Sequence, residues 1–250
     1  MIKFNKYLKR KVKAMEKIYT IPVNEAFESC QKNGCDCPLC KIYDTLEKKE
    51  VDMSLGSSMM EPSVRILMNE KGFCRDHFSK MLEKNNRLSL ALILESHLPE
   101  VKGKLNGGFF DAIFGGRAKK SFKNADKIVN SCFICERIDN HFEKMIETVV
   151  LLYDKEPDFR EKLRAQKYFC LPHYALLLDA AGRELDKRKY GEFYKDISEV
   201  ENKFLEKTVE DVSWFCKKFD YRYDSEPWYD SKDAPERAIR VLGGGVGKAK

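Results

Sequence analysis

The chain has 250 residues, of which 43% are hydrophobic and 34% are charged. This composition excludes a disordered chain and predicts a folded protein with one large core or two small ones. The longest apolar run, residues 88–94, is interrupted by Ser89 and is far shorter than the roughly 18 residues of a membrane span, so we expect no transmembrane segment. The net charge of +6 equals the excess of basic residues within residues 1–24, so the rest of the chain has no overall basic character.

Residues 1–24 are predicted to form a basic N-terminal extension with apolar residues at helical spacing. Such a segment suits a membrane surface or an acidic partner, and the simpler interpretation is a solvated extension. Translation from Met15, which opens the sequence MEKIYTIPV, is an alternative to translation from Met1. The first twenty residues lack the apolar region of a secretory signal, which predicts a cytoplasmic protein. Nine cysteines in a reducing cytoplasm favour metal or redox chemistry over a disulfide framework.

The cysteines and histidines indicate an internal duplication. Setting Cys37 against Cys132 aligns CPLCKIYDTLEK with CFICERIDNHFEK, then EPSVR with EPDFR, and then GFCRDHFSKML with YFCLPHYALLL. Eight of the thirteen Cys and His residues fall in this repeated frame of C-x-x-C followed by C-x-x-H. We therefore divide the chain into five parts: the basic extension (1–24), a first helical repeat (25–101), a Gly- and Lys-rich linker (102–125), a second helical repeat with a long C-terminal helix (126–242), and a flexible tail (243–250).

Both repeats predict the same order of helices. Apolar residues recur at three- and four-residue intervals after each C-x-x-C, and Pro38 suits the first turn of the first such helix. A helix begins near each Glu-Pro pair, with Gly72 as a stop signal in the first repeat, and another begins at each C-x-x-H. A long amphipathic helix is expected over residues 190–219. The sequence nowhere sustains strand alternation, so we predict an all-α fold.

Two metal sites follow from the repeated frame. Residues i and i+3 in the first turn of a helix lie on one face, so each motif supplies two convergent ligands. Helix N-termini favour thiolates, and three thiolates with one imidazole form a closed structural zinc set. We predict two zinc ions per chain, one in each repeat, with iron as the alternative metal. The predicted ligands are Cys37, Cys40, Cys74 and His77 in the first repeat, and Cys132, Cys135, Cys170 and His173 in the second.

Other cysteine chemistries fit the sequence less well. Covalent c-type haem needs His directly after C-x-x-C, where this chain has Lys41 and Glu136. An iron–sulfur cluster needs denser cysteine runs, and a thioredoxin-like motif needs a βαβ setting, although CPLC alone could be redox-active. Cys30 and Cys35 have no counterpart in the second repeat and are predicted to be spare loop thiols, either of which could exchange into the first site.

The remaining candidate residues are predicted to be structural. Cys216 lies on the apolar stripe of the long helix, which predicts a core position, and His97 and His141 are expected to be packed or surface histidines. The aromatic-rich segment 221–229 is interpreted as a loop that ties a terminal helix to the body of the protein, with a partner contact as the alternative.

Several longer motifs, KIYTIPVNEAF, GFCRDHF, NRLSLALILESHL, FCLPHY and PWYDSKDAPERAI, accompany CPLC and CFIC. With them, the chain resembles an uncharacterised bacterial family classed as a domain of unknown function. The resemblance covers about residues 15–242 and implies no established activity.

Two closed metal sites argue against an enzyme, because no coordination position would be left for a reactant. We therefore expect a non-catalytic zinc-binding interaction or adaptor protein with unidentified protein partners. One alternative is a nucleic-acid-associated protein that uses the two basic segments, residues 1–24 and 102–127. The other is a thiol-based redox or metal-responsive protein.

Overall fold

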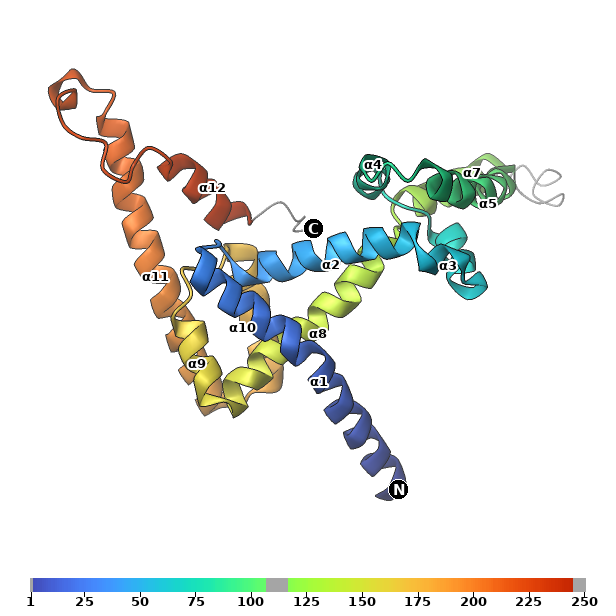
Figure 1. Ribbon diagram of the computed structural model, residues 1–250, viewed down its shortest axis with the longest axis horizontal. Helices are drawn as coiled ribbons and strands as arrows, with labels where there is room; N and C mark the ends of the chain where they lie inside the picture. Colours follow the sequence, from blue (N-terminus) through green and yellow to red (C-terminus); the bar gives the residue numbers. More distant parts are fainter. Residues whose placement is uncertain (1, 107–116, 245–250) are drawn as a thin grey trace. The chain divides into compact units, whose positions relative to one another are not determined.

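The structure is a computed structural model, which describes the backbone of residues 2–106 and 117–244 and the side chains of residues 18–105 and 118–244. The described residues form eleven α-helices and two short 3-10 helices, with no strand among them (Figure 1). The predicted all-α fold is therefore confirmed. Within this part of the chain, no helix combines the length and the apolar character that a membrane crossing requires.

The helices follow the order of the two repeats. The first repeat forms α1 (Ile2–Asn33), α2 (Pro38–Leu55), η1 (Ser57–Met60), α3 (Pro62–Lys71), α4 (Arg75–Glu83) and α5 (Arg87–Asn106). Helix α7 (Arg117–Val129) joins the expected linker to the second repeat, which goes on to form α8 (Phe133–Lys155), α9 (Pro157–Arg164), α10 (Leu171–Glu184) and α11 (Lys187–Lys217), and the chain continues into η2 (Tyr221–Tyr223) and α12 (Ala234–Gly243). The backbone of the predicted N-terminal extension is thus continuous with α1.

Local sequence signals set the helix boundaries. Proline occupies the first turn of α2, α3, α9 and α10, where its missing N–H costs nothing. Gly72 ends α3 with a positive φ of 62°, which other residues adopt at a cost. A Cβ atom at this position would also lie 3.0 Å from the ring of His97. Both the backbone conformation and the lack of space therefore favour glycine here.

The described chain packs into two units that do not coincide with the two repeats. Unit 1 contains residues 1–44 and 142–250, and unit 2 contains residues 45–141. The chain passes between the units inside α2 and again inside α8. Each unit therefore combines helices from both repeats. The expected linker, 102–125, belongs to unit 2: its described ends are helical parts of α5 and α7, and 107–116 lies outside the described residues.

Aromatic side chains form the core of unit 1. The ring of Phe27 on α1 lies 5.0 Å from that of Phe159 and 6.3 Å from that of Phe169, measured between centroids. Tyr168 stacks on Phe204 of α11 at 4.1 Å. Each of these rings is buried, and full burial of such a side chain stabilises the fold by about 1.5–3 kcal/mol. The segment before Cys170 is thereby fixed between α1 and α11.

Unit 2 has an aliphatic core. Its fully buried side chains include Met68, Met81, Ile93, Ile134 and Ile138, which come from both repeats. The apolar faces predicted for α2 and α8 are buried. One carboxylate enters this core, and it is paired: Glu50 is 3% exposed and accepts hydrogen bonds from Arg137 on α8.

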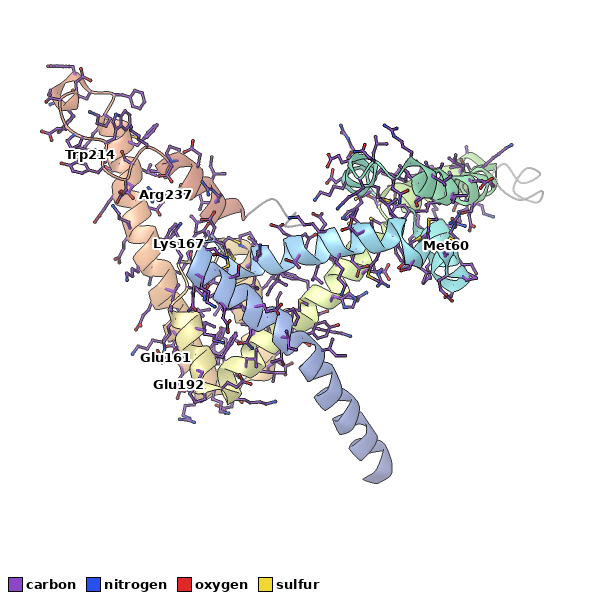
Figure 2. All side chains as sticks on the ribbon, in the orientation of Figure 1. Met60, Glu161, Lys167, Glu192, Trp214 and Arg237 are labelled. Carbon is purple, nitrogen blue, oxygen red and sulfur yellow. A yellow bond between two sulfur atoms is a disulfide. The ribbon has the colours of Figure 1, made fainter. Side chains whose placement is uncertain are left out.

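The aromatic segment after α11 ties α12 to the rest of unit 1. Figure 2 shows Trp214 near the end of α11 and Arg237 on α12. Trp214 Nε1 donates to the carbonyl of Pro227 at 3.0 Å. The Nζ of Lys218 donates to three carbonyls, those of Tyr223, Asp224 and Glu226. The interpretation of this segment as a loop that fixes a terminal helix is confirmed.

Candidate metal centres

All four Cys and His motifs lie at the first turn of a helix, as the sequence predicts. Cys37 and Cys132 directly precede α2 and α8, and their carbonyls accept the first backbone hydrogen bonds of these helices. Cys74 and Cys170 are the N-cap residues of α4 and α10. The second ligand of each motif follows three residues later, so it lies on the same helical face.

Four ligand side chains of unit 1 converge in cluster 1, which consists of Cys37, Cys40, Cys170 and His173. The Nδ1 atom of His173 lies 3.6, 3.4 and 3.1 Å from the Sγ atoms of Cys37, Cys40 and Cys170, respectively. The Sγ atoms of Cys40 and Cys170 are 3.6 Å apart. Cys37 and Cys170 are buried, whereas Cys40 and His173 are partly exposed.

Cluster 2 lies in unit 2 and consists of Cys74, His77, Cys132 and Cys135. The Nδ1 atom of His77 lies 3.2 Å from the Sγ atoms of Cys74 and Cys132 and 3.4 Å from that of Cys135. The Sγ atoms of Cys74 and Cys135 are 3.9 Å apart. A backbone hydrogen bond of 2.9 Å from Phe133 to the carbonyl of Gly72 joins the two motifs.

The pairing of the motifs differs from the prediction. All eight predicted residues lie in clusters, but the C-x-x-C of each repeat meets the C-x-x-H of the other repeat. Helix length explains this correction. Helix α2 has 18 residues and carries the chain about 27 Å away from Cys37 and Cys40. Helix α3 has only 10 residues, about 15 Å, and is too short to bring Cys74 and His77 back.

The spacing of the ligand atoms fits a tetrahedral metal ion. Zinc bonds of about 2.3 Å to sulfur and about 2.0–2.1 Å to nitrogen imply separations of about 3.8 Å between sulfurs and about 3.6 Å from sulfur to nitrogen. In cluster 1 the sulfur–sulfur distance is 3.6 Å, and the sulfur–nitrogen distances are 3.1–3.6 Å. In each cluster all four ligand atoms lie within 4.8 Å of one another. Both clusters therefore have the ligand types and the size of a Cys₃His metal site.

A family model described as a family of unknown function, DUF6062, matches residues 14–249. The chain belongs to this family. The match spans both repeats and both clusters, and its description assigns no activity. No curated protein and no solved structure matches the chain.

In each cluster, hydrogen bonds lower the pKa of one cysteine, Cys132 in cluster 2 and Cys40 in cluster 1. In cluster 2, hydrogen bonds from Cys135 and then His77 lower the pKa of Cys132 to about 3 despite its burial. The pKa of Cys135 is raised, because it donates that hydrogen bond and is partly buried. In cluster 1, hydrogen bonds from Cys170 and Cys37 similarly lower the pKa of Cys40. A divalent cation would supply the charge that lets the remaining thiols ionise.

The histidine of cluster 2 has an ionic neighbour that the sequence does not predict. His77 is 3% exposed, and its Nε2 atom lies 3.3 Å from Oε1 of Glu47. Glu47 also pairs with Lys80 of α4. Because Nδ1 faces the thiols, Nε2 lies on the side of Glu47, at ion-pair distance but without a hydrogen bond to it. In metal sites, a carboxylate in this place orients the ligating imidazole. In the sequence, Glu47 is one of four acidic residues of α2, and nothing sets it apart from the other three.

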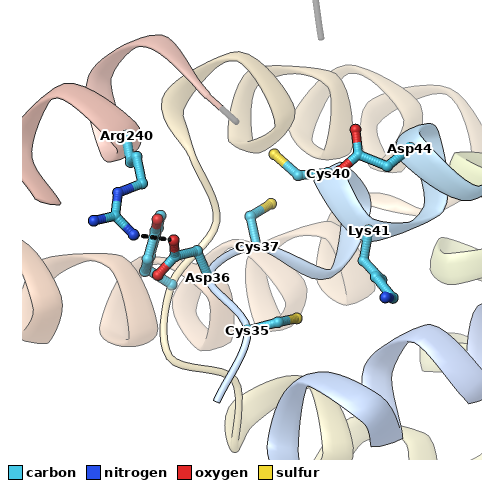
Figure 3. A pocket seen from close by; sticks show the side chains of 8 residues that line it. Cys35, Asp36, Cys37, Cys40, Lys41, Asp44 and Arg240 are labelled. Atoms are coloured by element: carbon cyan, nitrogen blue, oxygen red, sulfur yellow. Dashed lines mark hydrogen bonds and ion pairs between the residues drawn. The ribbon is translucent and has the colours of Figure 1, made fainter. Parts of the chain in front are cut away.

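Cluster 1 is reached from a cavity of about 170 Å³. Figure 3 shows Cys37 and Cys40 beside this cavity, with Asp36 bound by Arg240 of α12. The distance from Arg240 Nη1 to the Asp36 carboxylate is 2.8 Å. Two of the four ligands of cluster 1 therefore line a space that a small molecule can enter.

Three further predictions concern residues outside the clusters. Cys30 and Cys35 are not spare loop thiols: they form a disulfide, and Cys30 belongs to α1. Cys216 is exposed instead of buried, because the buried stripe of α11 runs through Thr208 and Asp211 and leaves Cys216 on another face. His97 is packed, as expected, with Nδ1 3.0 Å from the carbonyl of Asn69.

Proposed function

We propose that this protein is a non-catalytic interaction or adaptor protein that binds two zinc ions, one in cluster 1 and one in cluster 2. The observation that carries the proposal is the convergence of three cysteines and one histidine in each unit. A Cys₃His set fills all four positions of a tetrahedral zinc, whereas a catalytic zinc keeps one position for water or substrate. The proposal gives the metal a structural role in a cytoplasmic setting that keeps the ligand thiols reduced.

Bound zinc would join helices from different repeats. In unit 1 it would link the start of α2 to the start of α10, and in unit 2 the start of α4 to the start of α8. Structural zinc contributes about 10–16 kcal/mol of apparent binding free energy, which is comparable with the whole stability of about 5–15 kcal/mol of a typical domain. Loss of either metal is therefore expected to unfold its own unit.

The aromatic loop that follows α11 is the proposed partner-binding surface. Phe219, Tyr221 and Tyr229 are 75%, 88% and 66% exposed. The ring of Tyr229 packs against Trp214 and that of Phe219 against Trp228, so these two exposed rings rest on the aromatic side chains that fix the loop. Aromatic residues are enriched in protein interfaces, which supports an adaptor role for this surface.

Metal analysis tests the proposed zinc content. The full chain, purified under reducing conditions, is expected to contain two equivalents of zinc by elemental analysis. Iron would be recognised by the same measurement, and less than one equivalent of any metal would refute the proposal. Strong chelator is expected to reduce helical circular dichroism, because each metal joins two helices. A chelated, metal-free protein with full helicity and an unchanged melting temperature would contradict the structural role.

Partner capture tests the interaction role. The variant Phe219→Ala/Tyr221→Ala/Tyr229→Ala is expected to keep both metals and to lose a partner that the unmodified chain retains. The matched control is Ile66→Ala/Leu88→Ala in unit 2, which removes apolar side chains that are 66% and 72% exposed at another place. A partner retained by the aromatic variant and lost by the control would exclude the proposed surface.

A further inference from the structure

The disulfide between Cys30 and Cys35 closes the loop that leads into cluster 1. Cys30 lies in the last turns of α1, and Cys35 lies in the short loop before Cys37. Gly34 makes the turn between them with a positive φ of 65°. The loop is anchored a second time at Asp36, which binds Arg240 at 2.8 Å and Lys167 at 3.3 Å.

The second repeat has no such bond. The offset that matches Cys37 to Cys132 places Ala125 and Asn130 opposite Cys30 and Cys35. Cluster 2 therefore has the same four ligand types as cluster 1 without a neighbouring disulfide. Cluster 2 can therefore serve as an internal control for any effect of this disulfide on cluster 1.

The two sulfurs of the disulfide differ in accessibility. Cys30 is 5% exposed, whereas Cys35 is partly exposed and lines the cavity of about 170 Å³ together with Cys37 and Cys40. A thiol that enters from solvent therefore meets the Cys35 sulfur. Lys41 and Arg240, together with two carboxylates, also line the cavity.

We propose that Cys30 and Cys35 form a thiol–disulfide exchange site for low-molecular-weight thiols, and that its redox state controls how tightly cluster 1 holds its metal. The second half of this statement rests on the proposed function. The structural link is short: only Asp36 separates Cys35 from the ligand Cys37. With the disulfide closed, the backbone on the N-terminal side of Cys37 is held at Cys35 and at Asp36. Reduction removes the first of these two restraints.

The exchange balances with two thiol molecules. The sulfur of the first thiol attacks Sγ of Cys35, a mixed disulfide forms, and the Cys30 sulfur leaves and takes up the proton. A second thiol attacks the sulfur of the bound small molecule, which releases the small-molecule disulfide and leaves Cys35 as a thiol. The protein gains two hydrogens, and two small thiols become one disulfide. Re-oxidation by the same small-molecule disulfide reverses both steps.

Redox titration of the metal-loaded full chain tests the proposal. The protein is equilibrated in buffers of cysteine and cystine at different ratios, and a chelator is then added with an alkylating reagent. Peptide mass spectrometry reads each cysteine separately. Cys30 and Cys35 are expected to change together with the ratio. In reducing buffers the cysteines of cluster 1 should be alkylated about tenfold faster than in oxidising buffers, while those of cluster 2 keep one rate.

The variant Cys30→Ala/Cys35→Asn gives cluster 1 the residues that the second repeat carries. It is expected to show the fast rate at cluster 1 in every buffer, while its helicity and the rate at cluster 2 stay unchanged. Equal rates at cluster 1 in both redox states would overturn the coupling. A disulfide that cysteine cannot open in the folded protein would overturn the exchange site itself. Absence of metal would instead refute the proposed function, because the state of Cys30 and Cys35 is still read directly.

Discussion

Glu47 and Phe142 occupy equivalent positions of the two repeats, and each faces the histidine of the cluster in its own unit. The Glu47 carboxylate lies 3.3 Å from Nε2 of His77, whereas the Phe142 ring centroid lies 5.3 Å from that of His173. One imidazole thus lies beside a carboxylate and the other beside an aromatic ring. The two clusters have the same ligand types, but their neighbours make them chemically different.

This difference predicts that Glu47→Gln weakens metal binding at cluster 2 alone. Removal of a carboxylate that orients a ligating histidine lowers metal affinity by about 10- to 100-fold. Competition with a chromophoric chelator, with peptide-level alkylation to identify the cluster, measures this change. Asp52→Asn is the control, because it removes an exposed ion pair with Lys84 from the same helix. Equal effects of the two substitutions would exclude an orienting role for Glu47.

Pairs of cysteine substitutions test whether the C-x-x-C of each repeat shares a metal with the C-x-x-H of the other repeat. Cys37→Ser/Cys170→Ser removes two ligands from cluster 1, so this variant should keep one metal. Cys37→Ser/Cys74→Ser removes one ligand from each cluster, so both sites should bind metal poorly. Elemental analysis distinguishes the variants. Pairing within each repeat would give the opposite result, with one metal retained by the second variant.

Glu201 predicts a pH dependence of stability. It is 3% exposed, and burial raises its pKa to about 7, although it accepts a hydrogen bond of 3.0 Å from the backbone N–H of Phe169. Its folded-state pKa exceeds the ordinary 4.5, so the contribution to stability is present below about pH 4.5 and is lost as the pH rises toward 7. The neutral amide of Glu201→Gln avoids this loss. The variant should be more stable than the unmodified chain at pH 8, by about 1–3 kcal/mol.

Denaturant unfolding of the metal-loaded protein between pH 5 and pH 8 measures this effect. The difference between Glu201→Gln and the unmodified chain cancels changes that are common to both, such as protonation of the clusters. Glu199→Gln on the same helix is the control, since Glu199 is 67% exposed. A stability difference that does not grow with pH would show that Glu201 ionises normally in the folded protein.

A chain divided between the repeats should need both pieces to fold. Residues 1–106 and 117–250, produced as separate chains, each contain one C-x-x-C and one C-x-x-H that belong to different clusters. Each piece alone is expected to bind metal weakly and to be poorly helical, and a 1:1 mixture should recover two metals and the helicity. Circular dichroism, elemental analysis and light scattering measure these outcomes. Tight binding of one metal by an isolated piece would argue against the observed pairing.

Local features of the structure could be predicted from the sequence. The position of Pro38 and the stop at Gly72 depend on contacts within one or two helical turns, and the structure confirms both. All eight predicted Cys and His residues lie in the two clusters. The duplication was equally visible, because it needs only a comparison of the chain with itself. Helix order and the residues of the clusters thus follow from short-range rules.

Long-range pairing could not be predicted in the same way. The spacing of the motifs is identical whether Cys37 meets His77 or His173, and only the length of α2 decides between them. The prediction that Cys216 is buried is wrong for a related reason. Apolar periodicity predicts the helix, but it does not show which residues cover the last turns of that helix. The bond between Cys30 and Cys35 depends on the turn at Gly34, and the Asn-Gly signal for that turn does not indicate that the two cysteines meet.

The division of the chain into units also implies an order of events during translation. Unit 2 is a continuous segment, and its ligands Cys74 and Cys135 are 61 residues apart. Cluster 1 joins Cys40 to Cys170, which are 130 residues apart, so its first two thiols leave the ribosome long before their partners. Each doubling of the loop length raises the free energy of loop closure by only about 0.6 kcal/mol. Cluster 1 is therefore completed later than cluster 2 during synthesis, with little loss of stability. At about 5–20 residues per second, the nascent chain would carry Cys37 and Cys40 without Cys170 and His173 for several seconds, the interval in which a wrong metal or an oxidant has access to them.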